Sequence, residues 1–471
     1  MYKFIKGKFP HNKFLLTIYG IFSLYLFLYG SQPAYNKHDP DTFWHLSLGN
    51  WMLQHGNIVN TSINSFNEHL NYVPHEVLFQ ITISFIYHYF SWIGLHVFNV
   101  FWLGILIWGL YKLCFTSMEE FAIQKFHPYM HFLILLFVNF IYIMYMPLRP
   151  QMVSGSLTVW YFIWILKFRK DPTIKKGLVL GLFSLFISNV HGGIWPLLLI
   201  FYGIAIIELV VQRRKSYKAY SFTLLFILLG GFLNAGGWKT NFYIFLLMND
   251  PLTKSVNMEW QSVNFFENKV FLIIFVLILY GLIRLKTKNI FTILIAIVIT
   301  IFSVLSYKHA YYGLLLLLYI LPDGGITFKQ SIFTVHKKHF YPIIAFSLLL
   351  FLISGFYKPY IEPVSSYPVQ EMNYVLQVGN QHHKVKVLTD FTASAYANFR
   401  GASILADGRW DPFITKESRQ GKNHLNAIER SMYIFGISPN IHLLKEEISL
   451  SKPDYLIYKN SRSNPLIKTN V

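Results

Sequence analysis

Long apolar runs recur along residues 1–357, and they limit what this chain can fold into more than any other feature. Many approach the roughly 20 residues that a helix needs to cross the hydrocarbon of a bilayer. Hydrophobic residues make up 54% of the chain, charged residues only 13%, and the mean hydropathy is +0.40. These values exclude a soluble globule for this region and predict an all-α polytopic membrane protein.

The apolar runs predict about eleven transmembrane helices. We expect them over residues 14–30, 94–113, 129–146, 152–166, 178–190, 194–211, 219–234, 270–283, 290–306, 309–322 and 341–357. One further apolar run, 77–91, is left over. If it also spanned, the basic clusters from Lys167 to Lys288 would move to the outer side, so we predict a juxtamembrane helix that lies flat on the outer surface.

The positions of the basic residues favour a membrane protein over a nucleic-acid-binding one, although the net charge is +19. Lysines and arginines bunch in short loops between apolar runs, which is how orientation signals are arranged. Lys3 to Lys13 predict a cytoplasmic N-terminus, and the later clusters from Lys167 to Lys338 share that side. High Lys, Ile, Asn and Phe with little Ala suggest an AT-rich bacterial genome. We therefore expect a multi-pass protein of the bacterial cytoplasmic (inner) membrane, with membrane lipids and no nucleic acid as partners.

Residues 358–471 have ordinary polar content and predict a separate, small extracytoplasmic α/β domain after the transmembrane domain 1–357. Its expected strands are Val385 to Thr389, Ser403 to Ala406 and Tyr455 to Tyr458, and its expected helices are Ala393 to Phe399 and Leu425 to Phe435. Asp407-Gly408-Arg409-Trp410-Asp411 is its one conspicuous motif. No Gly-rich phosphate loop follows any strand.

The first outer loop, residues 31–93, is crowded with acids, histidines and tryptophans. Asp39 and Asp41 would point to the same side of an extended chain, and Pro40 argues against a regular helix through Asp39. Such a pair can divide labour, one carboxylate taking a proton while the other binds Mg²⁺ or Mn²⁺ or orients the acceptor. His45, His75 and Glu76 are candidate substrate or metal contacts, but His45 fits an aromatic belt equally well and Glu76 a helix N-terminus.

Further polar candidates stand at the predicted outer ends of helices. They are Arg149, Gln151, His191, Glu259, Lys308 and His309. Arg149 and Lys308 are either snorkelling cations or a clamp on a phosphate, Arg149 as a bidentate fork and Lys308 as a point charge. His191 and Glu259 are either substrate contacts or satisfied polar groups. That these candidates all fall on the outer side predicts a site there.

The order of these motifs resembles the bacterial GT-C-type membrane glycosyltransferases. The residues that carry the resemblance are Asp39 to Leu46, Gly49, Gly56-Asn57-Ile58, Ser65-Phe66, His75 to Leu78, Arg149-Pro150-Gln151, His191-Gly192-Gly193, Leu233 to Gly236, Glu259-Trp260 and Asp407 to Asp411. Two positions depart from the expected pattern: Tyr307-Lys308-His309 lacks an arginine-histidine pair, and Asn234-Ala235-Gly236 lacks a proline.

The resemblance implies a sugar donor carried on a polyprenyl phosphate, with or without Mg²⁺ or Mn²⁺, and an envelope glycan, lipid or protein as acceptor. It also implies Asp39 as the catalytic carboxylate, with Asp41 as its neighbour. Two alternatives from other classes remain. A lipid-linked-sugar transporter would place ionisable residues near mid-helix, where this chain has almost none. A non-catalytic subunit of an envelope polysaccharide assembly complex would tolerate the loss of both aspartates.

Overall fold

The structure, a computed structural model, describes residues 39–121, 148–213, 215–264, 289–320, 367–379, 384–436 and 440–458, with scattered positions between 267 and 283. The chain divides into two compact units. The helical unit holds the described residues from 96 to 121 and from 150 to 320, and the polar unit holds 39–95, 148–149 and those from 367 onward. Some predictions fall outside the described residues. They are the spans 14–30, 129–146 and 341–357, most of the span 270–283, and the domain boundary at residue 357.

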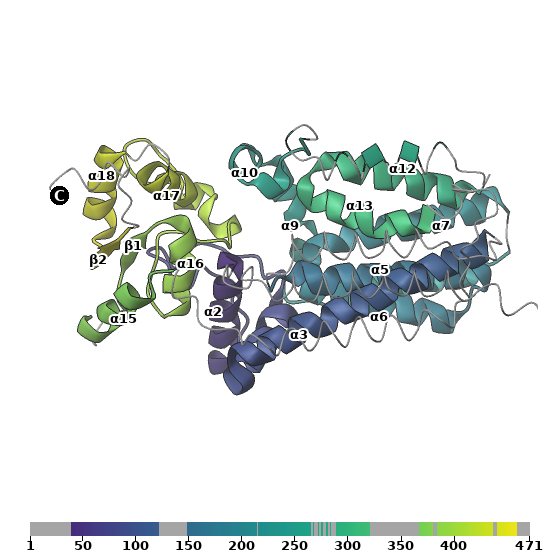
Figure 1. Ribbon diagram of the computed structural model, residues 1–471, viewed down its shortest axis with the longest axis horizontal. Coiled ribbons are helices and arrows are strands. Elements are labelled where there is room, and N and C mark those ends of the chain that lie inside the picture. The colour runs from purple at the N-terminus through teal and green to yellow at the C-terminus, as the bar shows by residue number, and fades with distance from the viewer. Residues whose placement is uncertain are drawn as a thin grey trace, which may run out of the picture. The chain divides into compact units, whose positions relative to one another are not determined.

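The helical unit is a bundle whose helices lie side by side (Figure 1). Its longer helices are α5 (Pro150–Lys170), α6 (Ile174–Val190), α7 (Trp195–Val211), α8 (Tyr217–Phe232), α12 (Ile290–Leu305) and α13 (Tyr307–Ile320). Each covers one of the predicted apolar runs to within a few residues. Among the described residues, Val77–Glu120 and Gly192–Val211 are long and apolar enough to cross a membrane, and Tyr217–Phe232 and Ile290–Leu305 are shorter apolar helices.

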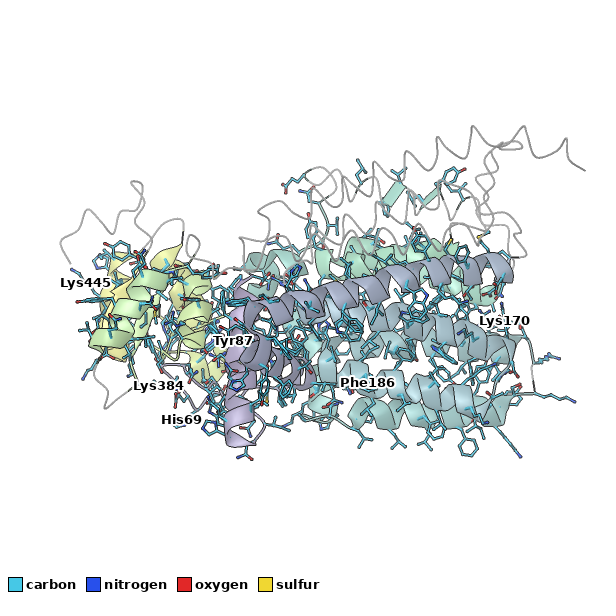
Figure 2. The ribbon with its side chains drawn as sticks, turned by 60° about the horizontal axis from the view of Figure 1, so that its bottom comes forward. His69, Tyr87, Lys170, Phe186, Lys384 and Lys445 are labelled. Carbon is cyan, nitrogen blue, oxygen red and sulfur yellow. The ribbon has the colours of Figure 1, made fainter. Side chains whose placement is uncertain are left out.

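Small residues let α6 and α8 pack closely. A Cβ added to Gly181 would lie 2.7 Å from Cβ of Phe226, and one added to Gly230 would overlap the carbonyl oxygen of Gly181. Such close approach of backbones is how helices associate where hydrophobic burial between them offers little gain. Phe186 of α6 is half exposed and Lys170 marks the exposed end of α5 (Figure 2).

The apolar run at 77–91 forms the first part of α3 (Val77–Glu120). Ser91, with φ 53° and ψ −151°, interrupts this helix, so the helix is broken close to the predicted boundary between the run 77–91 and the span 94–113. The flat orientation of the first part on a membrane surface stays a prediction.

Helices also form where the sequence predicted none. The helix α2 (Pro40–His55) occupies the acidic start of the first outer loop, and α9 (Trp238–Asn249) and α10 (Pro251–Val256) follow Asn234. The expectation of an extended chain is confirmed at Asp39, which lies outside the helix with φ −71° and ψ 131°, and is wrong at Asp41, which lies in the first turn of α2. Proline blocks a helix interior but favours its first turn, and here Pro40 is the first residue of α2 while Asp39 is its N-cap.

The polar unit joins the first outer loop to C-terminal segments. Its described elements beyond α2 are α15 (Val369–Val378), β1 (Val387–Thr389), α16 (Phe391–Phe399), α17 (Ala427–Phe435), α18 (Ile441–Ser451) and β2 (Tyr455–Ile457). The strands β1 and β2 pair in parallel. The expected strand at 403–406 is reduced to single bridges from Ser403 to Lys386 and from Ile404 to Ser65. Lys384, beside the loop that carries His69 (Figure 2), has its Nζ 3.4 Å from Glu68 Oε1.

Candidate active site at the start of α2

Asp39 and Asp41 are held by the first turn of α2. Asp39 is the N-cap, and its Oδ1 accepts a hydrogen bond of 2.9 Å from the backbone N–H of Asp41. This cap satisfies one of the unpaired N–H groups of the helix start. Asp41 lies within the first turn, and its Oδ1 accepts a hydrogen bond of 3.0 Å from Trp44 Nε1. Each carboxylate therefore has one oxygen committed to α2 itself.

The other oxygens of both carboxylates face Arg149, which is 110 positions from Asp39 along the chain. Arg149 Nε and Nη2 each lie 2.7 Å from Asp39 Oδ2, and Nη2 lies 3.3 Å from Asp41 Oδ2. The side chain of Asp39 is 9% exposed, that of Arg149 16% and that of Asp41 27%. The three groups carry one positive and two negative charges at a partly exposed position.

His45, His75 and Glu76 come together in a second, buried cluster of the polar unit. Glu76 Oε2 lies 3.5 Å from His45 Nδ1 and 3.7 Å from His75 Nε2. His45 Nδ1 also lies 3.5 Å from Gln80 Nε2, and the ring of His45 packs against Trp44 with centroids 3.6 Å apart. Trp44 thus contacts both clusters. All three predicted side chains are almost fully buried, so in this arrangement they contact other protein groups and present little surface to a substrate.

The loop Asp407 to Asp411 is part of this site, although the sequence analysis assigned it no role. A Cβ added to Gly408 would overlap Asp41 Oδ1 and would lie 2.6 Å from Trp44 Nε1. Only a glycine lets the backbone come this close to the carboxylate. The signal available in the sequence was the motif itself, but nothing in its spacing indicated which segment it contacts.

Buried charges hold this loop in place. Arg409 donates to Asp407 Oδ1 over 2.8 Å and to the carbonyl of Ile63 over 2.6 Å. Asp411 Oδ2 accepts a hydrogen bond of 3.0 Å from the backbone N–H of Val73. The pKa of the Asp411 carboxyl is raised to about 8, chiefly by burial and to a smaller extent by Asp407, while the hydrogen bond from Val73 and the charge of Arg409 act to lower it. The loop is therefore fixed to the first outer loop at several points.

Gln151 and His191 lie near each other in the helical unit. Ser154 Oγ is 2.9 Å from His191 Nδ1 and 2.9 Å from the hydroxyl of Tyr312, and the hydroxyl of Tyr311 donates to the carbonyl of Gln151 over 3.4 Å. His191 is almost completely buried. Ser154 Oγ also donates to the carbonyl of Gln151 over 3.4 Å, so these groups form one hydrogen-bonded cluster, which Gln151 joins through its backbone.

Lys308 and His309 both contact Trp260 in the helical unit, and Glu259 is the residue before Trp260 in the chain. Lys308 Nζ lies 4.9 Å from the centroid of the Trp260 ring, a cation–π contact, and the rings of Trp260 and His309 are edge to face with centroids 6.0 Å apart. Ser306 Oγ lies 2.7 Å from His309 Nδ1. Lys308 thus has an aromatic partner, and its predicted contact with a phosphate stays a prediction.

The predicted site residues therefore fall into two sets. The polar unit holds Asp39, Asp41, His45, His75, Glu76 and Arg149, and the helical unit holds Gln151, His191, Glu259, Lys308 and His309. The sequence predicted one outer site that contains both sets. That the two sets form one site stays a prediction.

The surroundings of Asp39 and Asp41 do not fit a divalent ion in the arrangement described above. Each of the four carboxylate oxygens either accepts a hydrogen bond or forms an ion pair. The guanidinium of Arg149 contacts both carboxylates and so lies where a cation bound by both would lie. In the parts of the chain that the structure describes, no group of three or more His, Cys, Asp or Glu side chains could hold a metal.

The fold of this chain is similar to that of solved GT-C transferases. The match to the oligosaccharyltransferase of Archaeoglobus fulgidus in the apo form covers 96% of this chain and 70% of the oligosaccharyltransferase chain, with a TM-score of 0.60 and 11% sequence identity. ArnT of Cupriavidus metallidurans in the apo state matches 97% and 95%, with a TM-score of 0.53 and 10% identity.

A further match is the archaeal oligosaccharyltransferase AglB from Archaeoglobus fulgidus in complex with an inhibitory peptide and a dolichol-phosphate. It covers 96% of this chain and 70% of its own, with a TM-score of 0.56 and 12% identity. No protein-family model matches the chain, and the comparison with curated proteins finds no match. At these identities the likeness is one of fold, and it confirms the GT-C resemblance at that level and supports a membrane location.

Proposed function

We propose that this protein is an integral-membrane glycosyltransferase that moves a sugar from a polyprenyl-phosphate donor to an envelope glycan, lipid or protein at the extracytoplasmic face of a bacterial inner membrane. The observation that carries the proposal is the contact between Asp39 and Arg149 on a GT-C fold. It joins a carboxylate that can accept a proton to a guanidinium that can bind a phosphate. AglB was solved with a dolichol-phosphate, a lipid phosphate of the kind that the proposed reaction would release.

The proposed reaction is a single displacement. An acceptor hydroxyl loses its proton to Asp39 while its oxygen forms a bond to the anomeric carbon of the sugar. The bond between that carbon and the phosphate oxygen breaks, and its electron pair stays on the lipid phosphate. The leaving group is already anionic and needs only charge stabilisation, which Arg149 supplies.

Turnover of the Asp39→Asn variant tests this assignment. Asparagine caps a helix as well as aspartate does, so α2 keeps its start, but the amide cannot take the proton. We expect turnover to fall by about 10²- to 10⁴-fold, the usual contribution of a general base. The assay is the release of polyprenyl monophosphate from lipid-linked sugars extracted from membranes, by purified protein in nanodiscs, read by mass spectrometry.

Asp171→Asn is the matched control, because Asp171 is an exposed carboxylate whose Oδ2 lies 2.7 Å from Lys176 Nζ. It removes the same charge at the turn between α5 and α6 and should leave turnover unchanged. Wild-type turnover in Asp39→Asn would remove Asp39 from the mechanism. A stable wild-type protein with no turnover on any extracted lipid-linked sugar would instead support a non-catalytic subunit.

A further inference from the structure

The Asp39, Asp41 and Arg149 cluster poses a problem for the proposed reaction. Asp39 Oδ2, the oxygen that is not committed to the cap of α2, receives two donors of Arg149 at 2.7 Å. An oxygen that already accepts two hydrogen bonds from Arg149 has its lone pairs occupied, so an acceptor hydroxyl cannot donate its proton there while Arg149 stays in place. The same guanidinium cannot fully engage a phosphate while it is turned toward two carboxylates.

We propose that the lipid phosphate and the two carboxylates compete for Arg149, so that donor binding draws Arg149 away and frees Asp39 to act as the base. Arg149 is then the resident cation of the carboxylate pair in the empty site and a phosphate ligand in the occupied one. This inference rests on the proposed function. It assigns Arg149 two successive partners and makes the base available only when a donor is bound.

The distances predict which carboxylate matters more. Asp39 accepts from two nitrogens at 2.7 Å, whereas Asp41 Oδ2 is 3.3 Å from one nitrogen and more exposed. Hydrogen bonds between charged groups weaken with length and exposure. Neutralising Asp39 should therefore release Arg149 more completely than neutralising Asp41.

The test is the affinity of purified protein in nanodiscs for a radiolabelled polyprenyl monophosphate. We expect Asp39→Asn to bind it about tenfold more tightly than wild type and Asp41→Asn about threefold, since charge-assisted hydrogen bonds are lost from the empty site. Arg149→Ala should bind at least about tenfold more weakly. The double variant Asp39→Asn with Arg149→Ala should bind no better than Arg149→Ala alone, because the gain acts through Arg149.

The sign of the effect separates this inference from a metal-bridged site. If the carboxylates held a divalent ion that in turn bound the phosphate, Asp39→Asn would weaken binding of the polyprenyl phosphate. Weaker binding by Asp39→Asn in the presence of Mn²⁺ would therefore overturn the inference. The proposed function as a lipid-phosphate-dependent transferase would not be affected. Unchanged affinity in both aspartate variants would overturn it as well. Asp171→Asn should bind as wild type does.

Two outcomes bear on the proposed function. If wild type binds no polyprenyl phosphate, both the inference and the lipid-linked donor are wrong. Inorganic phosphate could displace the label as well as the same concentration of unlabelled lipid does, and could bind Asp39→Asn more tightly than wild type. In that case competition for Arg149 is supported, and the lipid-linked donor is not.

Discussion

The replacement of Glu208 by leucine should destabilise the helical unit more than any surface substitution. Glu208 lies on α7 and is 1% exposed. Its two carboxylate oxygens accept from Arg169 of α5, Oε2 from Nε at 2.6 Å and Oε1 from Nη2 at 2.7 Å. Arg169 also donates to Glu120 of α3 over 2.9 Å and stacks 3.5 Å from the centroid of Phe291 on α12. One buried guanidinium thus ties four helices together.

Removing Glu208 leaves Arg169 buried with a single carboxylate partner. Breaking a buried ion pair costs about 3–5 kcal/mol, because the remaining charge is desolvated without compensation. Since Glu120 and the ring of Phe291 remain, we expect the lower end, about 3 kcal/mol. By the scaling for mid-sized domains this lowers the melting temperature by about 6–12 °C.

Thermal unfolding in detergent, followed by the fluorescence of the tryptophans, measures the effect. Asp171→Asn is again the control, since its pair with Lys176 is exposed and should contribute no more than about 1 kcal/mol. The double variant Arg169→Leu with Glu208→Leu should recover part of the lost stability, because it removes the stranded charge. Equal melting temperatures for Glu208→Leu and Asp171→Asn would refute this reasoning.

Two further predictions concern the loop that contacts Asp41. Gly408→Ala should lower turnover by about 10-fold or more, because its methyl group displaces Asp41 and Trp44, while the melting temperature changes little. The turnover assay described for Asp39→Asn measures the effect. Wild-type turnover would show that the loop is not part of the site. Asp411, with a pKa near 8 in the folded state and about 4 unfolded, contributes stability below pH 4 that is lost as the pH rises toward 8. Asp411→Asn should therefore gain stability relative to wild type between pH 5 and about pH 8. If the difference in melting temperature between the two proteins stays constant across that pH range, the carboxyl is not held protonated by burial.

The helices of the bundle could be predicted from the sequence because hydropathy is a local property. The runs at 152–166, 194–211 and 290–306 match α5, α7 and α12 closely. The helix α2 could not be found in this way. Pro40 is compatible both with a chain that avoids helix and with the first position of a helix, and only the capping contact of Asp39 decides between the two.

The candidate site shows the same division. The residue types alone made Asp39, Asp41 and Arg149 candidates, since carboxylates and a guanidinium are what proton transfer and phosphate binding need. That Arg149 reaches both aspartates, and that Gly408 packs against Asp41, depends on segments more than 100 and 300 positions apart meeting in space. No local pattern encodes such a meeting.

The sequence by itself predicted a membrane protein of many helices with an acidic segment between two of its apolar runs, because apolar length and charge placement act through the bilayer and need no tertiary contacts. Only the tertiary structure decided that one guanidinium contacts both aspartates and that a loop of the C-terminal segment touches one of them. Ion pairs and close backbone contacts depend on distances of a few ångströms between remote residues, and the folding of the whole polar unit sets those distances.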